Sequence, residues 1–309
     1  MKKITISELI EFASLDILAG FDGTNREISD DEITSPGVEF AGFFNYFESK
    51  RIVLIGSKEA NFLYGMDVEI QKSRVEELLK RDTPALLFSR NVIIAPYFIE
   101  LGNKYNIPIL RSELRTSPLY SKIYVYLRER LADRKGVHGV LMDINGMGTL
   151  IVGKSGIGKS ETALELIKRG HQLIADDLVE VYEREVGTLV GTAPEAIKTF
   201  LEVRGVGIIN VLETFGVAAY RGDKTIRLVI ELVAWEEQDN NDRLGLETAY
   251  ETYFHTELPK LQIPVQTGRN MAVVIEAAAM NEKLKYYGYN SALDVVRRVN
   301  EHVDKGDEE

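Results

Sequence analysis

The residues best suited to chemistry lie in one short segment near the middle of the 309-residue chain. There the sequence matches the phosphate-binding pattern G-x-x-x-x-G-K-[ST] in full. The segment consists of Gly153, Lys154, Ser155, Gly156, Ile157, Gly158, Lys159 and Ser160. Glycines let backbone N–H groups converge on phosphate oxygens, a lysine neutralises the terminal phosphates, and a serine hydroxyl can bind Mg²⁺. The segment therefore predicts a site for the phosphates of a nucleotide and for Mg²⁺.

The residues on either side of this segment predict the elements that such a loop requires. Residues 149–152 before it are apolar and mostly β-branched, which indicates a buried strand. Residues 162–167 after it suit a helix that ends at Gly170. The order of strand, glycine loop and helix places the helix N-terminus and its positive potential at the phosphates. This context disfavours a chance match to the pattern.

Two adjacent carboxylates, Asp176 and Asp177, follow the next predicted strand, residues 173–175. Open α/β sheets bind their ligands at the carboxyl ends of strands. Neighbouring carboxylates repel, so one of them can have a raised pKa, and such a group near a phosphate is suited to proton transfer. A helix cap or a turn is the alternative role for the pair.

Three further residues are weaker candidates. His138 precedes a predicted strand over residues 140–144, although a lone histidine is more often structural. Glu202 could complete the shell of a Mg²⁺ ion, which prefers one or two carboxylates besides phosphate and water, or it could belong to an ordinary charged turn. Arg243 lies in the polar segment 236–247 and could close over a phosphate, although most loop arginines face solvent.

The composition excludes several classes of protein. The chain has no cysteine, which removes disulfides, thiol nucleophiles and cysteine-ligated metals. The net charge of −11 disfavours generic nucleic-acid binding, which needs an excess of Lys and Arg. No apolar run reaches the roughly 18 residues that span a bilayer, and Glu8, Glu11 and Asp16 interrupt any signal-peptide core. We expect a cytoplasmic protein with no nucleic-acid or membrane partner.

The length favours two domains, and we place their boundary near residue 130. Residues 1–129 alternate short strands and helices, which predicts an α/β domain with a parallel sheet. There we expect strands over 51–56, 85–88 and 107–110, and helices over 4–13 with Ser7 as N-cap, 75–80, 96–105 and 121–131. An aromatic cluster, Phe40, Phe43, Phe44, Tyr46 and Phe47, favours a core or subunit contact over a partner surface. The candidate chemistry belongs to residues 130–309.

Together these residues resemble HPr kinase/phosphorylase, a bacterial family that acts on the phosphocarrier protein HPr. The resemblance rests on the phosphate-binding loop, on Asp176–Asp177, on Leu201–Asn210, on His138 and on Pro264–Arg269. It extends over the whole chain and is most specific from residue 130 onward. It implies a C-terminal P-loop kinase domain that is similar to phosphoenolpyruvate carboxykinase, and the chain has no H-R-D or D-F-G motif of eukaryotic protein kinases.

The resemblance implies a bifunctional enzyme in the control of carbon catabolite repression. In one direction it phosphorylates a regulatory serine of HPr with ATP or pyrophosphate. In the other, inorganic phosphate attacks the phosphoserine and pyrophosphate leaves. The family also implies a homo-oligomer, a hexamer.

The resemblance also implies roles for single residues. Asp177 is the base in phosphorylation and the acid in dephosphorylation, and His138 assists at the transferring phosphate and helps to set the ionisation of Asp177. Lys159 holds the β and γ phosphates, and Arg243 stabilises the developing charge. Ser160 and Glu202 bind Mg²⁺. Residues that fall in family motifs without an individual role here are Asp176, Arg204, Gly205 and Gly207, and, for dephosphorylation, Gln266, Thr267, Gly268 and Arg269.

Three other readings compete with this one. A P-loop kinase or carboxykinase for a small metabolite would use the same loop but would not need HPr. A nucleotide-sensing regulator would bind nucleotide without transferring phosphate, and it would tolerate Asp177→Asn. A GTPase is disfavoured because the chain has no N-K-x-D tetrapeptide to read guanine.

Overall fold

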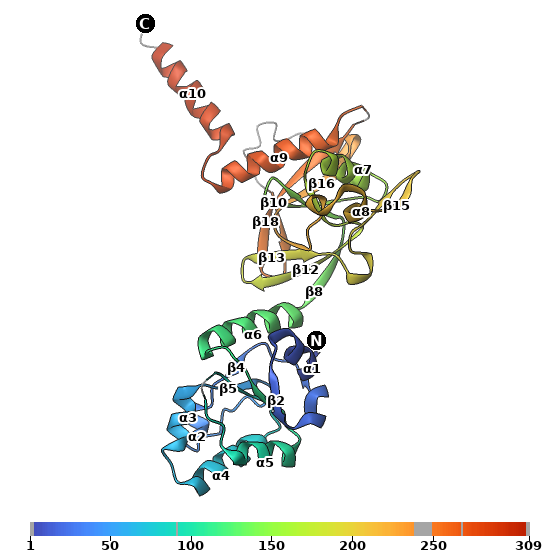
Figure 1. Cartoon of the computed structure of the whole chain (residues 1–309). Helices are drawn as coiled ribbons and strands as arrows, with labels where there is room; N and C mark the ends of the chain where they lie inside the picture. The colour runs from blue at the N-terminus through green and yellow to red at the C-terminus, as the bar shows by residue number, and fades with distance from the viewer. Residues whose placement is uncertain (1–2, 91, 238–248, 267, 307–309) are drawn as a thin grey trace. The chain divides into compact units, whose positions relative to one another are not determined.

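The computed structural model describes residues 3–90, 92–237, 249–266 and 268–306. The chain divides into two compact units, residues 1–133 and 134–309, and each has its own sheet and core (Figure 1). The division predicted between residues 129 and 130 stays a prediction. Within the described residues, no helix combines the length and apolar character needed to cross a bilayer.

The N-terminal unit is built around a five-stranded sheet in the order β2-β7-β6-β5-β4. The strands are β2 (Asp16–Ala19), β4 (Ile33–Thr34), β5 (Ile52–Ile55), β6 (Leu86–Phe88) and β7 (Ile109–Arg111). The pairs β4–β5, β5–β6 and β6–β7 are parallel, as predicted, and β2 joins β7 antiparallel. A separate antiparallel pair joins β1 (Ile4–Thr5) to β3 (Glu27–Ile28).

Helices cover both faces of this sheet because side chains alternate along its buried strands. Val53 and Ile55 of β5 pack with apolar residues of the helices on one face. Ile52 and Leu54 pack with those of the helices on the other. The helices are α1 (Ile6–Ala13), α2 (Gly37–Phe40), α3 (Ser57–Tyr64), α4 (Val68–Leu79), α5 (Pro96–Tyr105), α6 (Thr116–Leu131) and the 3₁₀ turn η1 (Phe21–Asn25).

Several local predictions in this unit were wrong in detail. The helix predicted over 75–80 extends over Val68–Leu79, and the helix predicted over 121–131 begins at Thr116. Thr5, not Ser7, caps α1, because its hydroxyl accepts the Glu8 N–H at 3.3 Å while the Glu8 carboxylate accepts the Thr5 N–H at 2.7 Å. The strand predicted from residue 107 begins at Ile109, after Pro108, which has no N–H to donate.

The aromatic cluster of the N-terminal unit divides between core and surface. Phe40 and Phe44 are buried, while Phe43 and Tyr46 are exposed. The expected core role therefore holds for only part of the cluster.

The C-terminal unit contains a nine-stranded sheet with the path β11-β9-β10-β16-β13-β12-β8, and β18 pairs with both β16 and β17. The strands are β8 (Arg134–His138), β9 (Val140–Ile144), β10 (Met147–Gly153), β11 (Gln172–Ala175), β12 (Leu178–Glu185), β13 (Thr188–Thr192), β16 (Asp223–Ala234), β17 (Ala249–Tyr253) and β18 (Thr256–Val265). A separate hairpin consists of β14 (Phe200–Val203) and β15 (Gly207–Asn210).

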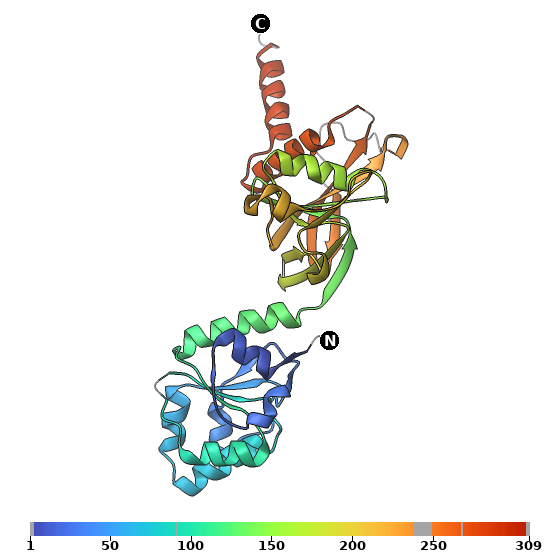
Figure 2. The same cartoon turned by 45° about the vertical axis from the view of Figure 1, so that its right-hand side comes forward.

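The helices of this unit are α7 (Lys159–Lys168), α8 (Val211–Phe215), α9 (Met271–Tyr286) and α10 (Ser291–Gly306), with the 3₁₀ turns η2 (Glu195–Ile197), η3 (Val217–Ala219) and η4 (Trp235–Glu237). Apolar residues of α7 and α9 pack on one face of the sheet, among them Leu166 and Ile275 against Ile151 and Ile230. The other face packs within the sheet, where Leu150 and Val229 meet residues of β12 and β13. The C-terminal helix α10, drawn in red, extends away from the sheet of its unit (Figure 2).

Strand direction brings three chain segments to one edge of this sheet. β9 is antiparallel to both β10 and β11, so β10 and β11 run in the same direction. Their carboxyl ends therefore lie at the edge where β9 begins. The predicted order of strand, glycine loop and helix is observed, with the loop after β10 at this edge.

Candidate active site

The glycine loop between β10 and α7 has a backbone that side chains would strain. Gly153, Gly156 and Gly158 have φ angles of 145°, 82° and 102°, in the region that glycine tolerates best. No described side chain caps the start of α7 at Gly158. The first N–H groups of the helix are thus free to bind an anion.

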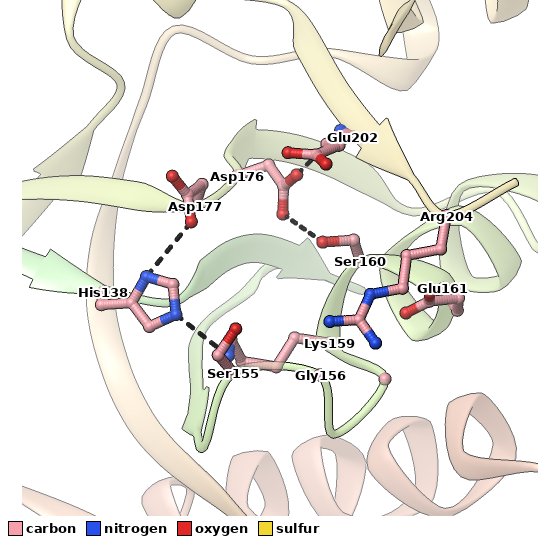
Figure 3. Close-up of a pocket in the computed structure, with 11 residues that line it drawn as sticks. His138, Ser155, Gly156, Lys159, Ser160, Glu161, Asp176, Asp177, Glu202 and Arg204 are labelled. Atoms are coloured by element: carbon pink, nitrogen blue, oxygen red, sulfur yellow. Dashed lines mark hydrogen bonds and ion pairs between the residues drawn. The ribbon is translucent and has the colours of Figure 1, made fainter. Parts of the chain in front are cut away.

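This loop lines a small polar cavity of about 120 Å³ (Figure 3). Its lining residues are His138, Ser155, Gly156, Gly158, Lys159, Ser160, Glu161, Asp176, Asp177, Glu202 and Arg204. Apart from the glycines, every lining residue is polar or charged. The volume and the lining suit phosphate groups more than an apolar ring system.

Lys159 lies at the centre of the cavity. Its ammonium donates to the carbonyl oxygens of Gly153 at 2.9 Å and Lys154 at 3.2 Å. Burial lowers the pKa of Lys159, and the nearby charges of Asp176 and Asp177 oppose that shift. The ammonium is therefore held at the cavity by loop carbonyls, and an incoming phosphate oxygen would replace one of its present acceptors.

His138 links Lys159 to Asp177. Its Nε2 lies 3.3 Å from the Lys159 ammonium, and its Nδ1 lies 3.2 Å from Asp177 Oδ1. One neutral tautomer satisfies both contacts, since Nδ1–H can donate to the carboxylate while Nε2 accepts from the ammonium. The Gly139 N–H donates to the Asp177 carbonyl at 3.1 Å, and a Cβ at Gly139 would lie only 2.6 Å from the Ile151 carbonyl oxygen, so glycine is needed at this bend.

The side chains of the two adjacent aspartates lie in different surroundings. Asp177 has a left-handed backbone with φ 65°, and its side chain is 69% exposed, whereas Asp176 is buried. Asp176 accepts from the Ser160 hydroxyl at 2.9 Å and from the Glu202 N–H at 3.0 Å. It is therefore the anchor that joins the helix start to the hairpin.

Burial raises the pKa of Asp176, and the hydrogen bonds from Glu202 and Ser160 oppose that shift. The charge of Asp177 is a smaller cause. The predicted repulsion between the two carboxylates does raise the pKa of Asp176, but burial is the larger cause.

The hairpin of β14 and β15 supplies Glu202 and Arg204 to the cavity. The Arg204 guanidinium lies over the glycine loop, so that a Cβ at Gly156 would be 2.9 Å from its Nη2. Gly205 and Gly207 have φ angles of 80° and 101° and form the hairpin tip outside the cavity lining. A cation is thus placed beside the loop on the side opposite His138 (Figure 3).

The cavity offers oxygen ligands for Mg²⁺ from Ser160, Asp176 and Glu202. Among the described residues, no group of three or more His, Cys, Asp or Glu side chains could hold a metal alone. Mg²⁺ commonly takes one or two carboxylates and fills its shell with substrate phosphates and water. This donor set therefore fits an ion that binds together with a polyphosphate.

The remaining predicted residues lie elsewhere. Arg243 and Thr267 fall outside the described residues. Gln266, Gly268 and Arg269 follow β18, which is parallel to β16 and so ends at the same sheet edge as β10, but they do not line the cavity.

Sequence reasoning missed Glu161, which lines the cavity from the first turn of α7. The available signal was its place directly after Ser160, since acidic residues are favoured at helix starts.

Comparison with known proteins gives matches along nearly the whole chain. The family model "HPr Serine kinase N terminus" matches residues 4–127, and "HPr Serine kinase C-terminal domain" matches residues 129–299. The proteins named HPr kinase/phosphorylase from Geobacillus sp. (strain WCH70) and Bacillus subtilis (strain 168) are each 44% identical. The first alignment covers 99% of both chains and the second 100% of both.

A solved structure titled "Structure of the Hpr(Ser) kinase/phosphatase from Coxiella burnetii" is 34% identical. It covers 52% of this chain and 98% of its own, with a TM-score of 0.48.

Proposed function

The chain belongs to the HPr serine kinase family, and on that premise we propose how its site serves HPr. The best-supported function is phosphorylation of a serine of HPr and removal of that phosphate. One observation carries the mechanism: Lys159, His138 and Asp177 form a continuous line of contacts at a phosphate-sized cavity.

We propose that the glycine loop and Lys159 hold the phosphates of ATP or pyrophosphate. The open start of α7 supports this role. Ser160 and Glu202 would bind Mg²⁺, which neutralises phosphate charge when it is bound. Because the cavity lining holds no apolar side chain, recognition of the donor would rest on its phosphates.

Asp177 is the group best placed to move the serine proton. In phosphorylation, the serine oxygen bonds to the terminal phosphorus, the bond from that phosphorus to the leaving phosphate oxygen breaks, and the serine proton passes to Asp177. In the reverse reaction, an oxygen of inorganic phosphate attacks the phosphoserine phosphorus, and the serine oxygen leaves with the proton of Asp177. The contact with His138 Nδ1 orients the carboxylate in both directions.

Several features of the family are carried over as proposals. They are a role in carbon catabolite repression, a cytoplasmic location, a homohexamer, closure of Arg243 over the transferring phosphate, and a contribution of residues 264–269 to dephosphorylation. The full-length relatives named HPr kinase/phosphorylase favour this function over a small-metabolite kinase or a non-catalytic regulator. The protein incubated with HPr, ATP and Mg²⁺, and then with inorganic phosphate, should first form phosphoserine and then release pyrophosphate.

The variant Asp177→Asn tests the mechanism. It keeps the shape of the side chain but cannot accept a proton, so both reactions should slow by roughly 10²- to 10⁴-fold while ATP binding persists. Turnover is measured on HPr and binding by calorimetry, with Asp133→Asn as an exposed control. Parallel loss of binding and turnover would make Asp177 a metal ligand or a structural residue instead, and unchanged turnover would remove it from the mechanism.

A further inference from the structure

One face of the β14–β15 hairpin carries apolar side chains beside the phosphate cavity. Glu202 and Ile208 are direct cross-strand partners, and Phe200 precedes Glu202 by two residues. Side chains at such positions project from the same face of a strand pair. Leu201 and Ile209, on the other face, pack in the core. Phe200 and Ile208 therefore flank a side chain that lines the cavity.

These apolar side chains are open to solvent. Ile208 and, at the hairpin tip, Val206 are each 72% exposed, and Phe200 is 41% exposed. We call Phe200, Val206 and Ile208 the hairpin strip. Exposed apolar side chains on one face and at the tip of a hairpin beside a polar active site are typical of a contact surface.

The size of the hairpin strip favours a macromolecule over part of the phosphate donor. Four residues per strand extend over about 13 Å, and the strip lies on a projecting hairpin outside the cavity lining. The cavity itself, of about 120 Å³, takes phosphate groups. A nucleobase can stack on a single aromatic ring such as Phe200, but it would leave Val206 at the hairpin tip uncovered.

The acceptor serine must be delivered to the same edge of the sheet. Its oxygen has to reach Asp177, which faces the cavity together with Glu202 (Figure 3). A folded protein that presents its serine at this edge would also contact the β14–β15 hairpin. The strip is continuous with the catalytic cavity through the Glu202–Ile208 pair.

We propose that the hairpin strip is the docking surface for an apolar patch on HPr, next to its acceptor serine. This inference rests on the proposed function and names the part of the enzyme that holds the protein substrate. Docking there sets substrate affinity, while phosphate transfer itself depends on the cavity.

The test compares two phosphate donors, one with a nucleobase and one without. In Ile208→Ser and Val206→Ser, KM for HPr should rise about ten-fold, equally with ATP and with pyrophosphate, while kcat and the KM of each donor stay near those of the parent. Serine adds no charge opposite Glu202. Ile208→Leu should restore the parent KM, and Val186→Ser, at an 82% exposed valine in the turn between β12 and β13, is the matched control.

Each other outcome overturns the inference. A rise in the KM of ATP but not of pyrophosphate would make the strip a nucleobase platform. A parallel fall in melting temperature and donor binding would make it structural, and an unchanged KM for HPr would place docking elsewhere. If the parent phosphorylates HPr with neither donor, the proposed function fails first and this inference falls with it.

Discussion

The two units differ at the start of a helix that follows a parallel strand. Each has a helix that starts beyond the carboxyl end of a parallel strand, β5 leading to α3 and β10 leading to α7. At α3 the Gly56 N–H is bound at 3.0 Å by the Glu59 carboxylate of the same helix. No described side chain caps the first-turn N–H groups of either helix, so the difference lies in the Glu59 carboxylate that occupies the start of α3.

Chain length between strand and helix explains the difference. Only Gly56 separates β5 from α3, and a Cβ there would lie 2.7 Å from the Thr116 hydroxyl. Residues 154–158 separate β10 from α7, which is enough to form a loop of converging N–H groups. Gly56-Ser57-Lys58 carries a glycine and a lysine at a helix start, so residue types alone do not make the anion site. The start of α7 differs from that of α3 in its longer glycine loop, and no carboxylate is described on the N–H of its N-cap residue as Glu59 is on that of Gly56.

The variant with the largest expected effect on this comparison is Lys159→Met. The change leaves phosphate charge uncompensated, and we expect both reactions to fall by on the order of 10²-fold or more, because the same phosphates are held in each. Lys58→Met, at the filled start of α3, should leave both rates unchanged. Steady-state rates on HPr and on its phosphorylated form decide the matter, and a Lys159 variant with near-normal rates would remove the loop from the mechanism.

A third helix start sharpens the comparison. Asn270 caps α9 through the Val273 N–H, so a phosphate beyond β18 would need the side chain of Arg269 more than the helix. We expect Arg269→Ala to weaken phosphorolysis on the order of ten-fold more than phosphorylation. The ratio of the two rates at fixed Mg²⁺ and varied phosphate measures this, with Arg115→Ala as an exposed control. A constant ratio would show that the segment does not select direction.

Removal of the carboxylate at the start of α3 should lower the stability of the N-terminal unit and leave the activity unchanged. Glu59→Ala leaves the Gly56 N–H without its partner and should destabilise the N-terminal unit by about 1 kcal/mol. Faster hydrogen exchange of α3 amides would report it, with both rates on HPr unchanged. If the variant instead gained a pyrophosphate site in this unit, an open helix start alone would be sufficient and the comparison would fail.

The smallest effect concerns Asp176, whose pKa is raised by burial. A carboxyl with a raised pKa in the folded state favours folding when it is protonated, and that contribution is lost as pH rises through its pKa. Asp176→Asn keeps both contacts, since its amide can donate to Ser160 and its carbonyl can accept from Glu202. Melting curves without Mg²⁺ should show the variant a few degrees more stable at pH 7, with the difference shrinking as pH falls through the raised pKa and lost below about pH 4. A variant less stable at pH 7 would show that the hydrogen bonds of the charged form outweigh its burial.

The sequence was most informative where the residues that determine a structural feature lie close together in the chain. The glycine loop, its strand and its helix follow from local residue types, and the parallel sheet of the N-terminal unit follows from alternating elements. The cap of α1 was also readable, because Thr5 and Glu8 have the spacing of a capping box. The prediction of Ser7 rests on its residue type and leaves that pair out.

Other features depend on tertiary structure. Asp176 and Asp177 look equivalent in the sequence, but the left-handed turn at Asp177 sends one carboxylate into the protein and the other to solvent. The position of Arg204 over Gly156 results from the approach of a distant hairpin. The position of Arg243 and its role stay predictions.

The order of strands at the active-site edge has a consequence for folding kinetics. β9, β10 and β11 are consecutive in the chain, and β9 lies between the other two in the sheet. β9 and β10 form a tight hairpin, and β11 returns to β9 directly after α7. The parallel partners β16 and β18 come much later in the chain, and such pairings close long loops and form slowly. We therefore expect His138, the glycine loop and the aspartate pair to come together early in folding, before the parallel strands β16 and β18 join the sheet.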